Sequence, residues 1–533
     1  MYFSAIMESQ VDNAIASVAV LSLLIRTVPE GVPGGDAGEL LAEACHYGVA
    51  HPPGYPLFTL LSGAVMRLSR ACGSGMGPAQ TINALCAVLG AMTCFFIGRT
   101  TAMLCSLVMP KDAPVGPVSA ISGVLFALSP LVWEYSIGAE VFALNNMLCS
   151  LLLYCAGRVA MTSSTGVVRE CAIGAFISGL ALSNQHTSLL FIAPIVVYAM
   201  RVLHRHKKLS VKTVSQCGMC FFFGLLPYSY LHYASRTPAP GSWGDLTSVR
   251  GFLRHIARTE YGTLKLAPNL GEVEGWFERW KAYGAHALKE SHIVGLALAI
   301  VGAAHAIHRE VKQIPGLSAN TAFGEKRHRI GSGDVGRIHF PCSTFAATFL
   351  FYQAVWNGLF SNLPLSFPMA YAVHSRFWMQ PSLILCVFSG TGIAVVLSSL
   401  DIGKKAKTCL GRILLLATYI HCAHQHFHSM DKSGSNGMVL SDYGNAILDT
   451  IPPNSLLVAH TDLDWNTVSF KKQYSQIHYL FCGEDFSLLH LFFLSLFFLF
   501  QGAVYSHLRE CNPRSCCPCE RPAPAVPMVS TSS

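Results

Sequence analysis

Apolar segments of about 20 residues recur along this chain, and they constrain its fold more than any other feature. A run of that length is what an α-helix needs to cross the hydrocarbon layer of a bilayer. The runs fall near residues 14–29, 79–98, 118–134, 140–157, 171–185, 187–200, 214–233, 291–308, 342–361, 379–400 and 408–425. Charged residues make up only 12% of the 533 residues, well below the roughly 25% of soluble proteins. We therefore predict an all-α polytopic membrane protein with about 11 transmembrane helices.

The apolar run at residues 55–66 differs from the others because it is short. It follows three prolines and ends in Arg67 and Arg70, which favours a helix that lies in the membrane interface or re-enters without crossing. We predict that this run does not span the bilayer.

Basic residues occur in alternate links between the predicted spans. These links lie near residues 99–111, 158–169, 201–212, 309–337 and 404–412. The positive-inside rule places all five in the cytosol and puts the start of the chain on the same side. Four polar motifs then share the opposite, luminal face; they contain Asp36, Glu140, the Asn184/His186 turn and the His374/Arg376 loop. The sequence therefore predicts that these motifs converge, although none of them was used to derive the topology.

The most distinctive polar motif follows the first apolar segment. It consists of GGDAGEL at residues 34–40 and GVAHPPGYPLF, which begins at Gly48. Asp36 and Glu39 share one face if the first part is helical, and its glycines allow the backbone to approach a ligand closely. The double proline after His51 stops any helix from running through that histidine. The motif indicates two acids and a histidine on a bent loop, and the alternative is a surface turn with a helix cap.

Together with three further motifs, this stretch resembles the transmembrane protein 260 family of protein O-mannosyltransferases. The further motifs are AEVFALNN at 139–146, LSNQHT at 182–187 and HSRFWMQ at 374–380. They fall in order, and the resemblance covers roughly residues 14–480. It implies a C-type glycosyltransferase fold in the membrane and a lipid-linked sugar donor.

The resemblance also implies transfer of a sugar from a lipid phosphate to a hydroxyl group, which needs a carboxylate to accept the proton. Asp36 is the expected general base, because related C-type enzymes carry an acidic catalytic residue on the first luminal loop. Glu39 is the second candidate, or else an acid stabilised by a helix dipole. Glu140 begins a span, where a carboxylate is costly unless it faces a polar cavity; the alternative is a simple capping acid.

The donor phosphate and the sugar need cations and polar groups to hold them. Arg376 is the expected phosphate ligand, because a guanidinium can grip phosphate through two hydrogen bonds. The alternative is an interfacial arginine solvated among lipid headgroups. The other predicted donor- or sugar-binding residues are polar side chains that could equally serve in packing between helices. They are His51, His186, His374, Asn145 and Asn184.

Two groups of metal-binding residue types lack the spacing of a closed metal site. They are the histidines at positions 421, 424, 426 and 428 and the pair Cys516/Cys519. We expect no metal and no cofactor, with dolichyl phosphate mannose acting as a co-substrate. No basic stripe with interleaved aromatic residues indicates nucleic-acid binding, so the net charge of +8 is better explained by membrane orientation.

The predicted organisation has three parts. Residues 1–428 form the transmembrane glycosyltransferase domain, with a luminal loop at 235–290 that carries an amphipathic interfacial helix around Trp276–Trp280. Residues 429–485 form a small mixed α/β luminal segment, with a helix up to Asp449 and a strand at 455–459. We expect this segment to be truncated relative to the family, because no 34-residue helical repeat follows it. Residues 486–533 hold an apolar run at 488–500, expected to be a membrane anchor, and a Cys/Pro-rich tail.

The leading hypothesis is therefore an inverting protein O-mannosyltransferase in the endoplasmic-reticulum membrane, with its active face in the lumen. By resemblance, its acceptors are Ser and Thr residues in the plexin-type (IPT) domains of cell-surface receptors. The alternatives are a membrane transporter and a catalytically inactive membrane partner. Broken paired spans and internal repeats, which would favour a transporter, are not detected in the sequence.

Overall fold

The computed structural model describes residues 2–238, 241–263, 265–266, 273–312 and 341–452. In this part of the chain every regular element is a helix, which confirms the predicted all-α class. The chain divides into two units, Met1–Ser475 and Gln476–Ser533, and all described residues lie in the first. The strand predicted at 455–459 and the apolar run at 488–500 lie outside the described residues.

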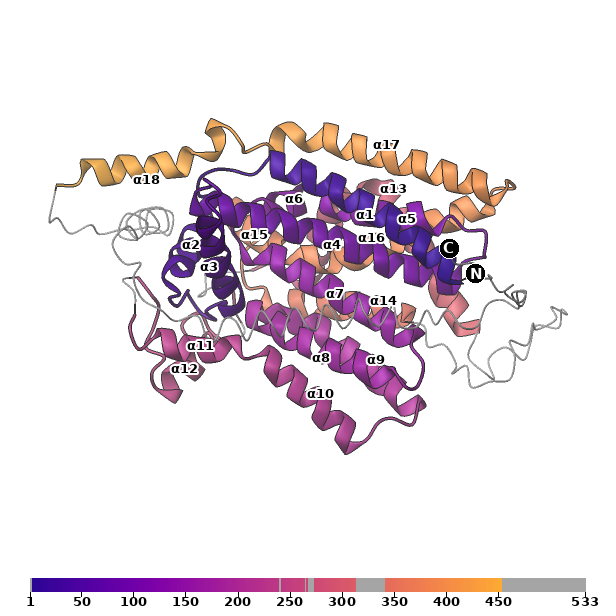
Figure 1. The fold of residues 1–533 in the computed structure, drawn as a ribbon, viewed down its shortest axis with the longest axis horizontal. Helices are drawn as coiled ribbons and strands as arrows, with labels where there is room; N and C mark the ends of the chain where they lie inside the picture. The colour runs from indigo at the N-terminus through magenta and orange to yellow at the C-terminus, as the bar shows by residue number, and fades with distance from the viewer. Residues whose placement is uncertain (1, 239–240, 264, 267–272, 313–340, 453–533) are drawn as a thin grey trace, which may run out of the picture. The chain divides into compact units, whose positions relative to one another are not determined.

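The helices that make up the body of the first unit are mostly long and lie side by side (Figure 1). They are α1 (Tyr2–Arg26), α4 (Pro78–Val108), α5 (Val115–Ala127), α6 (Pro130–Ser136), α7 (Val141–Met161), α8 (Val167–Asn184), α9 (Leu189–Arg205), α10 (Val211–Gly224), α13 (Trp276–Lys312), α14 (Cys342–Val355), α16 (Met379–Ser399) and α17 (Lys404–Met430).

Shorter helices connect these long ones, and several of them build the candidate site. They are α2 (Ala37–His46), α3 (Pro56–Ala71), α11 (Pro227–Ala234), α12 (Val249–Ile256), α15 (Pro368–Ser375) and α18 (Val439–Thr450), together with single turns η1 (His186–Ser188), η2 (Trp356–Phe360), η3 (Arg376–Trp378) and η4 (Ser435–Gly437). Helices α3, α4, α6, α11 and α15 each begin with a proline, which suits a first turn because its missing N–H would have no partner there.

Within the described residues, six helical segments are long and apolar enough to cross a membrane. They are Pro78–Val108, Val141–Met161, Val167–Asn184, His186–Arg205, Ile293–Lys312 and Pro368–Ser399. The pair α5 and α6, bent by 73°, adds a seventh if it is counted as one span. The remaining predicted spans coincide with α1, with α10 and α11, with α14 and with α17, which are helical but do not meet this test of length and composition. The protein is a multi-pass membrane protein.

Close backbone contact joins α13 to α16. A Cβ atom on Gly302 would lie 2.0 Å from the carbonyl oxygen of Phe388, and one on Gly392 would lie 2.0 Å from that of Leu298. Only glycine fits at such a crossing, and small residues of this kind are what allow transmembrane helices to pack tightly.

Two local predictions from the sequence can be compared with the helices. The run at 55–66 forms most of α3, a helix of 16 residues that lies beside α2 and is not among the candidate spans. The helix predicted around Trp276–Trp280 also forms, but it is the first part of the 37-residue α13 and is continuous with the following span. The prediction of a separate interfacial helix is therefore wrong. No proline interrupts the chain between Trp276 and Lys312, so nothing ends the helix where its hydropathy changes.

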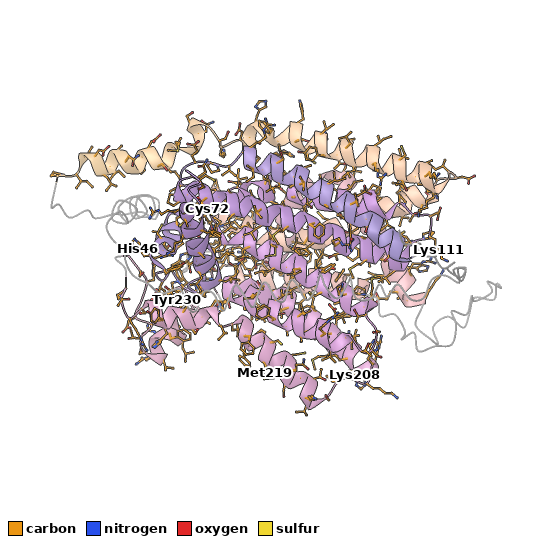
Figure 2. All side chains as sticks on the ribbon, in the orientation of Figure 1. His46, Cys72, Lys111, Lys208, Met219 and Tyr230 are labelled. Carbon is orange, nitrogen blue, oxygen red and sulfur yellow. The ribbon has the colours of Figure 1, made fainter. Side chains whose placement is uncertain are left out.

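The two ends of the helical body differ in character (Figure 2). His46, Cys72 and Tyr230 lie at the end that carries α2, α3 and α11, whereas Lys111 and Lys208 lie at the other end. Lys111 and Lys208 belong to two of the links that the positive-inside rule places in the cytosol. The arrangement agrees with the predicted separation of basic links from polar motifs.

We expect Cys72 and position 209 to lie on opposite sides of the membrane. Cys72 is exposed directly after α3, and Leu209 is exposed in the link between α9 and α10. In sealed microsomes, a membrane-impermeant maleimide should label a Leu209→Cys variant at once and Cys72 only after permeabilisation. Peptide mass spectrometry gives both results from one sample, with buried Cys86 as the unlabelled control. Labelling of both positions before permeabilisation would show that α3 crosses the bilayer.

Candidate active site

The carboxylate of Glu140 joins segments that are far apart in the sequence. Glu140 precedes α7 in an extended conformation, and its side chain does not cap its own helix. Instead its Oε1 accepts a hydrogen bond of 2.9 Å from the backbone N–H of Asp36, the residue at the start of α2. A negative charge is stabilised at that position by the free N–H groups and dipole of α2. Its other oxygen, Oε2, is buried and has no hydrogen-bond partner in the described part of the chain.

Gly35 lets this contact form. Its φ of +60° lies in the left-handed region, and a Cβ atom at this position would come within 2.6 Å of Glu140 Oε1. An L-residue is disfavoured here both by the backbone angle and by the carboxylate. The glycine in the GGDAGEL motif therefore has a specific physical role, which is to let the chain pass over the Glu140 side chain.

Arg376 completes what we call the acid–arginine cluster, which consists of Asp36, Glu140 and Arg376. Its Nη1 lies 3.4 Å from Asp36 Oδ2 and 3.8 Å from Glu140 Oε1. The guanidinium also lies over the ring of Phe142, with Cζ 5.4 Å from the ring centroid. The side chains of Arg376 and Glu140 are 12% and 6% exposed, whereas that of Asp36 is 38% exposed. Asp36 is therefore the member of the cluster most accessible to an incoming molecule.

Glu39 and His51 form a second pair beside the cluster. Glu39 accepts a hydrogen bond of 2.6 Å from the backbone N–H of His51, and its other oxygen lies 3.0 Å from His51 Nδ1. Aromatic rings surround the imidazole: the ring centroids of Tyr55, Trp243 and Tyr261 lie 5.1, 6.4 and 6.5 Å away. The double proline that follows His51 therefore turns the chain back so that this histidine faces the start of α2.

The environment shifts the pKa values of two of these groups. Burial, and then the charge of Asp36, raise the pKa of Glu140, while Arg376 opposes the shift. Burial alone would lower the pKa of His51, but the carboxylate of Glu39 more than offsets this, so the pKa of His51 is raised. His51 is thus favoured as the imidazolium ion, and Glu140 retains a proton to higher pH than an ordinary glutamate.

The other predicted site residues make contacts within the helical body. His374 is fully buried, with Nδ1 2.6 Å from Ser361 Oγ and Nε2 accepting from the Trp356 indole at 3.3 Å. His186 Nε2 lies 2.6 Å from the hydroxyl of Tyr228. These contacts hold helices together, so a donor-binding role for either histidine stays a prediction.

The two predicted asparagines make similar contacts. Asn184 donates to the carbonyl of Val141 at 3.0 Å, and Asn145 accepts from Ser188 at 2.6 Å. Both side chains are buried. Their predicted role in sugar binding also stays a prediction, because these bonds join α8 and the turn η1 to α7.

Several residues at the site could not be identified, or were not identified, from the sequence. Trp243 comes from the loop after α11, and Arg258 and Tyr261 come from the loop after α12. Neither loop carries a motif or gives a signal that it folds onto His51. Tyr55 and Phe142 lie inside the quoted motifs and could have been identified from them. Among the described residues, no group of three His, Cys, Asp or Glu side chains is arranged to hold a metal ion.

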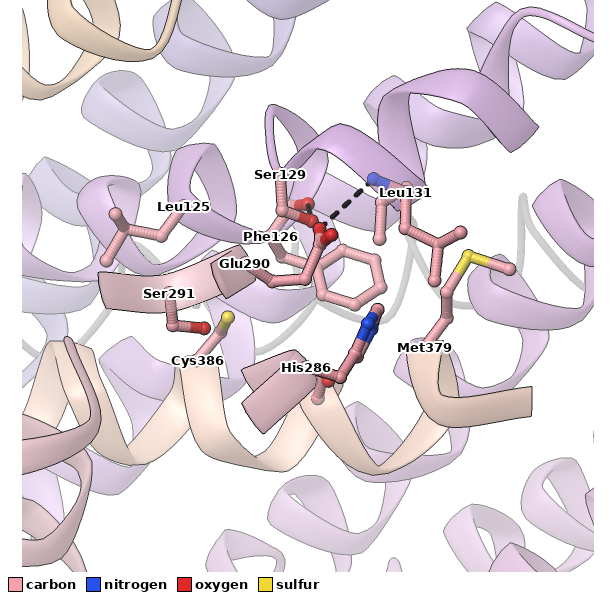
Figure 3. A pocket seen from close by; sticks show the side chains of 11 residues that line it. Leu125, Phe126, Ser129, Leu131, His286, Glu290, Ser291, Met379 and Cys386 are labelled. Atoms are coloured by element: carbon pink, nitrogen blue, oxygen red, sulfur yellow. Dashed lines mark hydrogen bonds between the residues drawn. The ribbon is translucent and has the colours of Figure 1, made fainter. Parts of the chain in front are cut away.

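A separate pocket lies at the bend between α5 and α6 (Figure 3). Glu290 of α13 accepts a hydrogen bond of 3.1 Å from the backbone N–H of Leu131, one of the free N–H groups at the start of α6. Ser129 donates to the same carboxylate. The carboxylate therefore satisfies backbone groups that the break in the helix would otherwise leave without partners.

The fold and the site define a multi-pass helical membrane protein with paired acids and an arginine where its helices meet. Residues 36–210 match the family model described as "Protein O-mannosyl-transferase TMEM260 N-terminal domain". The chain is 32% identical over 469 residues to the mouse protein O-mannosyl-transferase TMEM260, covering 85% of this chain and 59% of the relative. The Dictyostelium discoideum protein O-mannosyl-transferase tmem260 is 29% identical over 465 residues, covering 82% of this chain and 52% of the relative.

The chain is a relative of the TMEM260 protein O-mannosyltransferases, which confirms the resemblance found in the motifs. It spans a little over half the length of the curated relatives that it matches. Part of it also resembles the solved Saccharomyces cerevisiae Pmt1–Pmt2 O-mannosyltransferase complex bound to the sugar donor, at 15% identity and a TM-score of 0.33. That match covers 42% of this chain and 33% of the yeast chain, a likeness too slight to define the fold.

Replacing Gly35 by alanine should destabilise the protein by more than its backbone angle alone explains. A left-handed residue other than glycine costs about 1–2 kcal/mol, and disturbing a hydrogen bond to a buried carboxylate adds about 1–3 kcal/mol. Gly73→Ala is a matched control, because Gly73 has a similar φ of +63° but no atom within 4 Å of its Cβ position. Thermal unfolding in detergent should show the larger loss for Gly35→Ala. Equal losses would mean that Glu140 does not constrain this position.

Proposed function

We propose that this protein is an inverting O-mannosyltransferase that transfers mannose from dolichyl phosphate mannose to Ser or Thr of a protein acceptor. The observation that carries the proposal is Asp36, a partly exposed carboxylate held 3.4 Å from Arg376, whose side chain is mostly buried. The named relatives support the activity, and the match to their N-terminal domain begins at Asp36 itself.

In the proposed reaction, the acceptor hydroxyl oxygen attacks the anomeric carbon while Asp36 takes the hydroxyl proton. The bond between that carbon and the phosphate oxygen breaks, and the phosphate leaves with the electron pair. Attack opposite to the leaving group converts a β-linked mannose into an α-linked product. Proton, sugar and phosphate are all accounted for, so no metal or redox cofactor is required by this scheme.

Asp36 suits the role of general base better than Glu39 does. Both oxygens of Glu39 are engaged by His51, and its side chain is only 8% exposed. Asp36 contributes its backbone N–H to Glu140, which fixes its position while leaving its own carboxylate accessible. Glu140 is therefore proposed as a positioning residue, and Arg376 as the group that orients Asp36 and faces the phosphate.

The proposal also includes the compartment in which the protein acts and the class of its acceptor. We place the site on the luminal side of the endoplasmic-reticulum membrane, which the basic links at the other end of the helical body support. The acceptors would be IPT-type domains of cell-surface receptors, an assignment that rests on the family resemblance. Transfer of labelled mannose from dolichyl phosphate mannose to such a domain by the purified protein tests the function directly. Absence of transfer would favour a transporter or an inactive membrane partner.

Asp36→Asn should abolish turnover while leaving donor binding nearly intact. Asparagine keeps the volume of the side chain but cannot accept the proton, and loss of a positioned base typically lowers the rate about 10²–10⁴-fold. Mannose transfer and donor affinity should be measured on the same folded preparation. Asp245→Asn, which changes an exposed acid in the loop after α11, is the control and should transfer normally. Transfer near the wild-type rate in Asp36→Asn would remove this residue from the mechanism.

Glu39→Gln should move the pH dependence of the site. The raised pKa of His51 means that stabilisation by its imidazolium is complete below its ordinary pKa and is lost as pH rises through the raised value. Without the Glu39 carboxylate, burial lowers the pKa of His51 with less opposition, so the loss of stability as pH rises should shrink or reverse. The measurement is the melting temperature as a function of pH, with the exposed acid variant Glu278→Gln as control. An unchanged profile in Glu39→Gln would show that His51 is not held as the charged form.

A further inference from the structure

The two cations at the site already face acids, which leaves little positive charge available to bind a phosphate. Arg376 already faces two carboxylates, at 3.4 and 3.8 Å, and His51 already faces Glu39 at 3.0 Å. The guanidinium and the imidazole thus each already face an acid, and Glu140, which retains its proton to higher pH, adds no positive charge. The phosphate leaving group carries two negative charges and would lie among carboxylates as well as these two cations. Transfer as proposed above therefore needs a further positive group at the same site.

Arg258, directly after α12, has the right surroundings to supply that charge. Its guanidinium lies over the ring of Tyr261, 5.2 Å from Cζ to the centroid, and this ring in turn faces His51 at 6.5 Å. Among the described residues Arg258 forms no ion pair. Its guanidinium donates a long hydrogen bond of 3.4 Å to the carbonyl of Leu266, and its Nε is buried without a partner in the described part of the chain.

The surroundings of Tyr55 show that Arg258 and the cluster share one site. Burial raises the pKa of Tyr55, and the charge of Arg258 is the largest influence that opposes this, followed on the same side by Arg376. The Tyr55 ring also packs against His51 at 5.1 Å. The charges of both guanidiniums therefore act on the Tyr55 side chain.

The backbone at Arg258 is unusual for its residue type. Two hydrogen bonds close α12, from Arg258 N to the carbonyl of His255 and from Thr259 N to that of Arg254. This pattern places Arg258 at the left-handed position that glycine normally takes after a helix, and its φ is +53°. Glycine would fit this backbone better, so the turn itself does not require an arginine here.

We propose that Arg258 binds the phosphate of the lipid-linked donor, as the cation that is not already committed to a carboxylate. The proposal rests on the mannosyltransferase function for the identity of the donor. The shared chemistry is a phosphate ester, which a lipid-linked phosphate and free inorganic phosphate could both provide. The test therefore includes both.

Binding of dolichyl phosphate to the purified full chain in detergent provides the test, since it needs no turnover. Arg258→Gly should weaken binding about 10- to 100-fold, the effect of losing one charge-assisted contact. Its melting temperature should stay the same or rise, because glycine relieves the backbone. Arg258→Lys should recover much of the affinity, and Arg254→Ala, an exposed arginine of the same helix, should bind like the wild type. Dolichol without phosphate should bind all variants equally.

Three kinds of result would overturn the assignment of Arg258. Normal dolichyl phosphate binding by Arg258→Gly, or failure of the wild type to bind this lipid, would exclude Arg258 as its phosphate ligand. A fall in melting temperature with equal losses for dolichol and dolichyl phosphate would show a structural role. Inorganic phosphate that binds as tightly as the lipid would point to a free anion instead. If Arg258→Gly weakens lipid binding but the wild type transfers no mannose, this inference stands and the proposed function fails.

Discussion

A carboxylate buried at the start of a helix is the interaction on which the rest of the site depends. Glu140 is 5% exposed, and a charge in such surroundings is costly unless other groups compensate it. Its partners are the backbone N–H at the start of α2 and the guanidinium of Arg376. One partner lies more than 100 residues before Glu140 in the sequence and the other more than 100 residues after it. One side chain therefore holds the first polar loop, the start of α7 and the turn before α16 together. Burying the Glu140 carboxylate without these partners would cost free energy, so the arrangement that supplies them is favoured over others.

Much of this arrangement could be predicted because its causes are local or arise from the bilayer. Apolar runs become helices since a membrane leaves the backbone no other way to satisfy its hydrogen bonds, and alternating basic links set which motifs share a face. Asp36, Glu39, His51, Glu140 and Arg376 were therefore brought together correctly from sequence. His186, His374, Asn145 and Asn184 could not be assigned in the same way. A polar side chain near a span has the same sequence signal whether it binds a ligand or a neighbouring helix, and these four form bonds between helices in the structure.

The loop after α11 was beyond sequence reasoning for a different reason. Trp243 reaches His51 because Ser242 donates to Glu43 at 2.6 Å, and because the backbone N–H of Trp243 bonds to the carbonyl of Val49. The two bonds connect positions 199 and 194 residues apart, and neither leaves a periodic or compositional mark in the sequence. Burial raises the pKa of Glu43 to about 8, and the hydrogen bond from Ser242 opposes the shift. The contact between Glu43 and Ser242 is therefore buried and polar, and only the tertiary structure reveals it.

The continuity of α13 has a mechanical consequence. Its 37 residues extend about 55 Å, whereas the hydrocarbon layer is about 30 Å thick, so much of the helix projects beyond that layer. Arg279 lies in the projecting part and bonds to Ser361 and to the carbonyl of Leu363, and Ser361 in turn contacts His374, two residues before Arg376. The helix is therefore one continuous connection between its glycine crossing with α16 and the turn that carries Arg376. A tilt of the membrane part of α13, such as a change in bilayer thickness can cause, would displace the end that holds this turn.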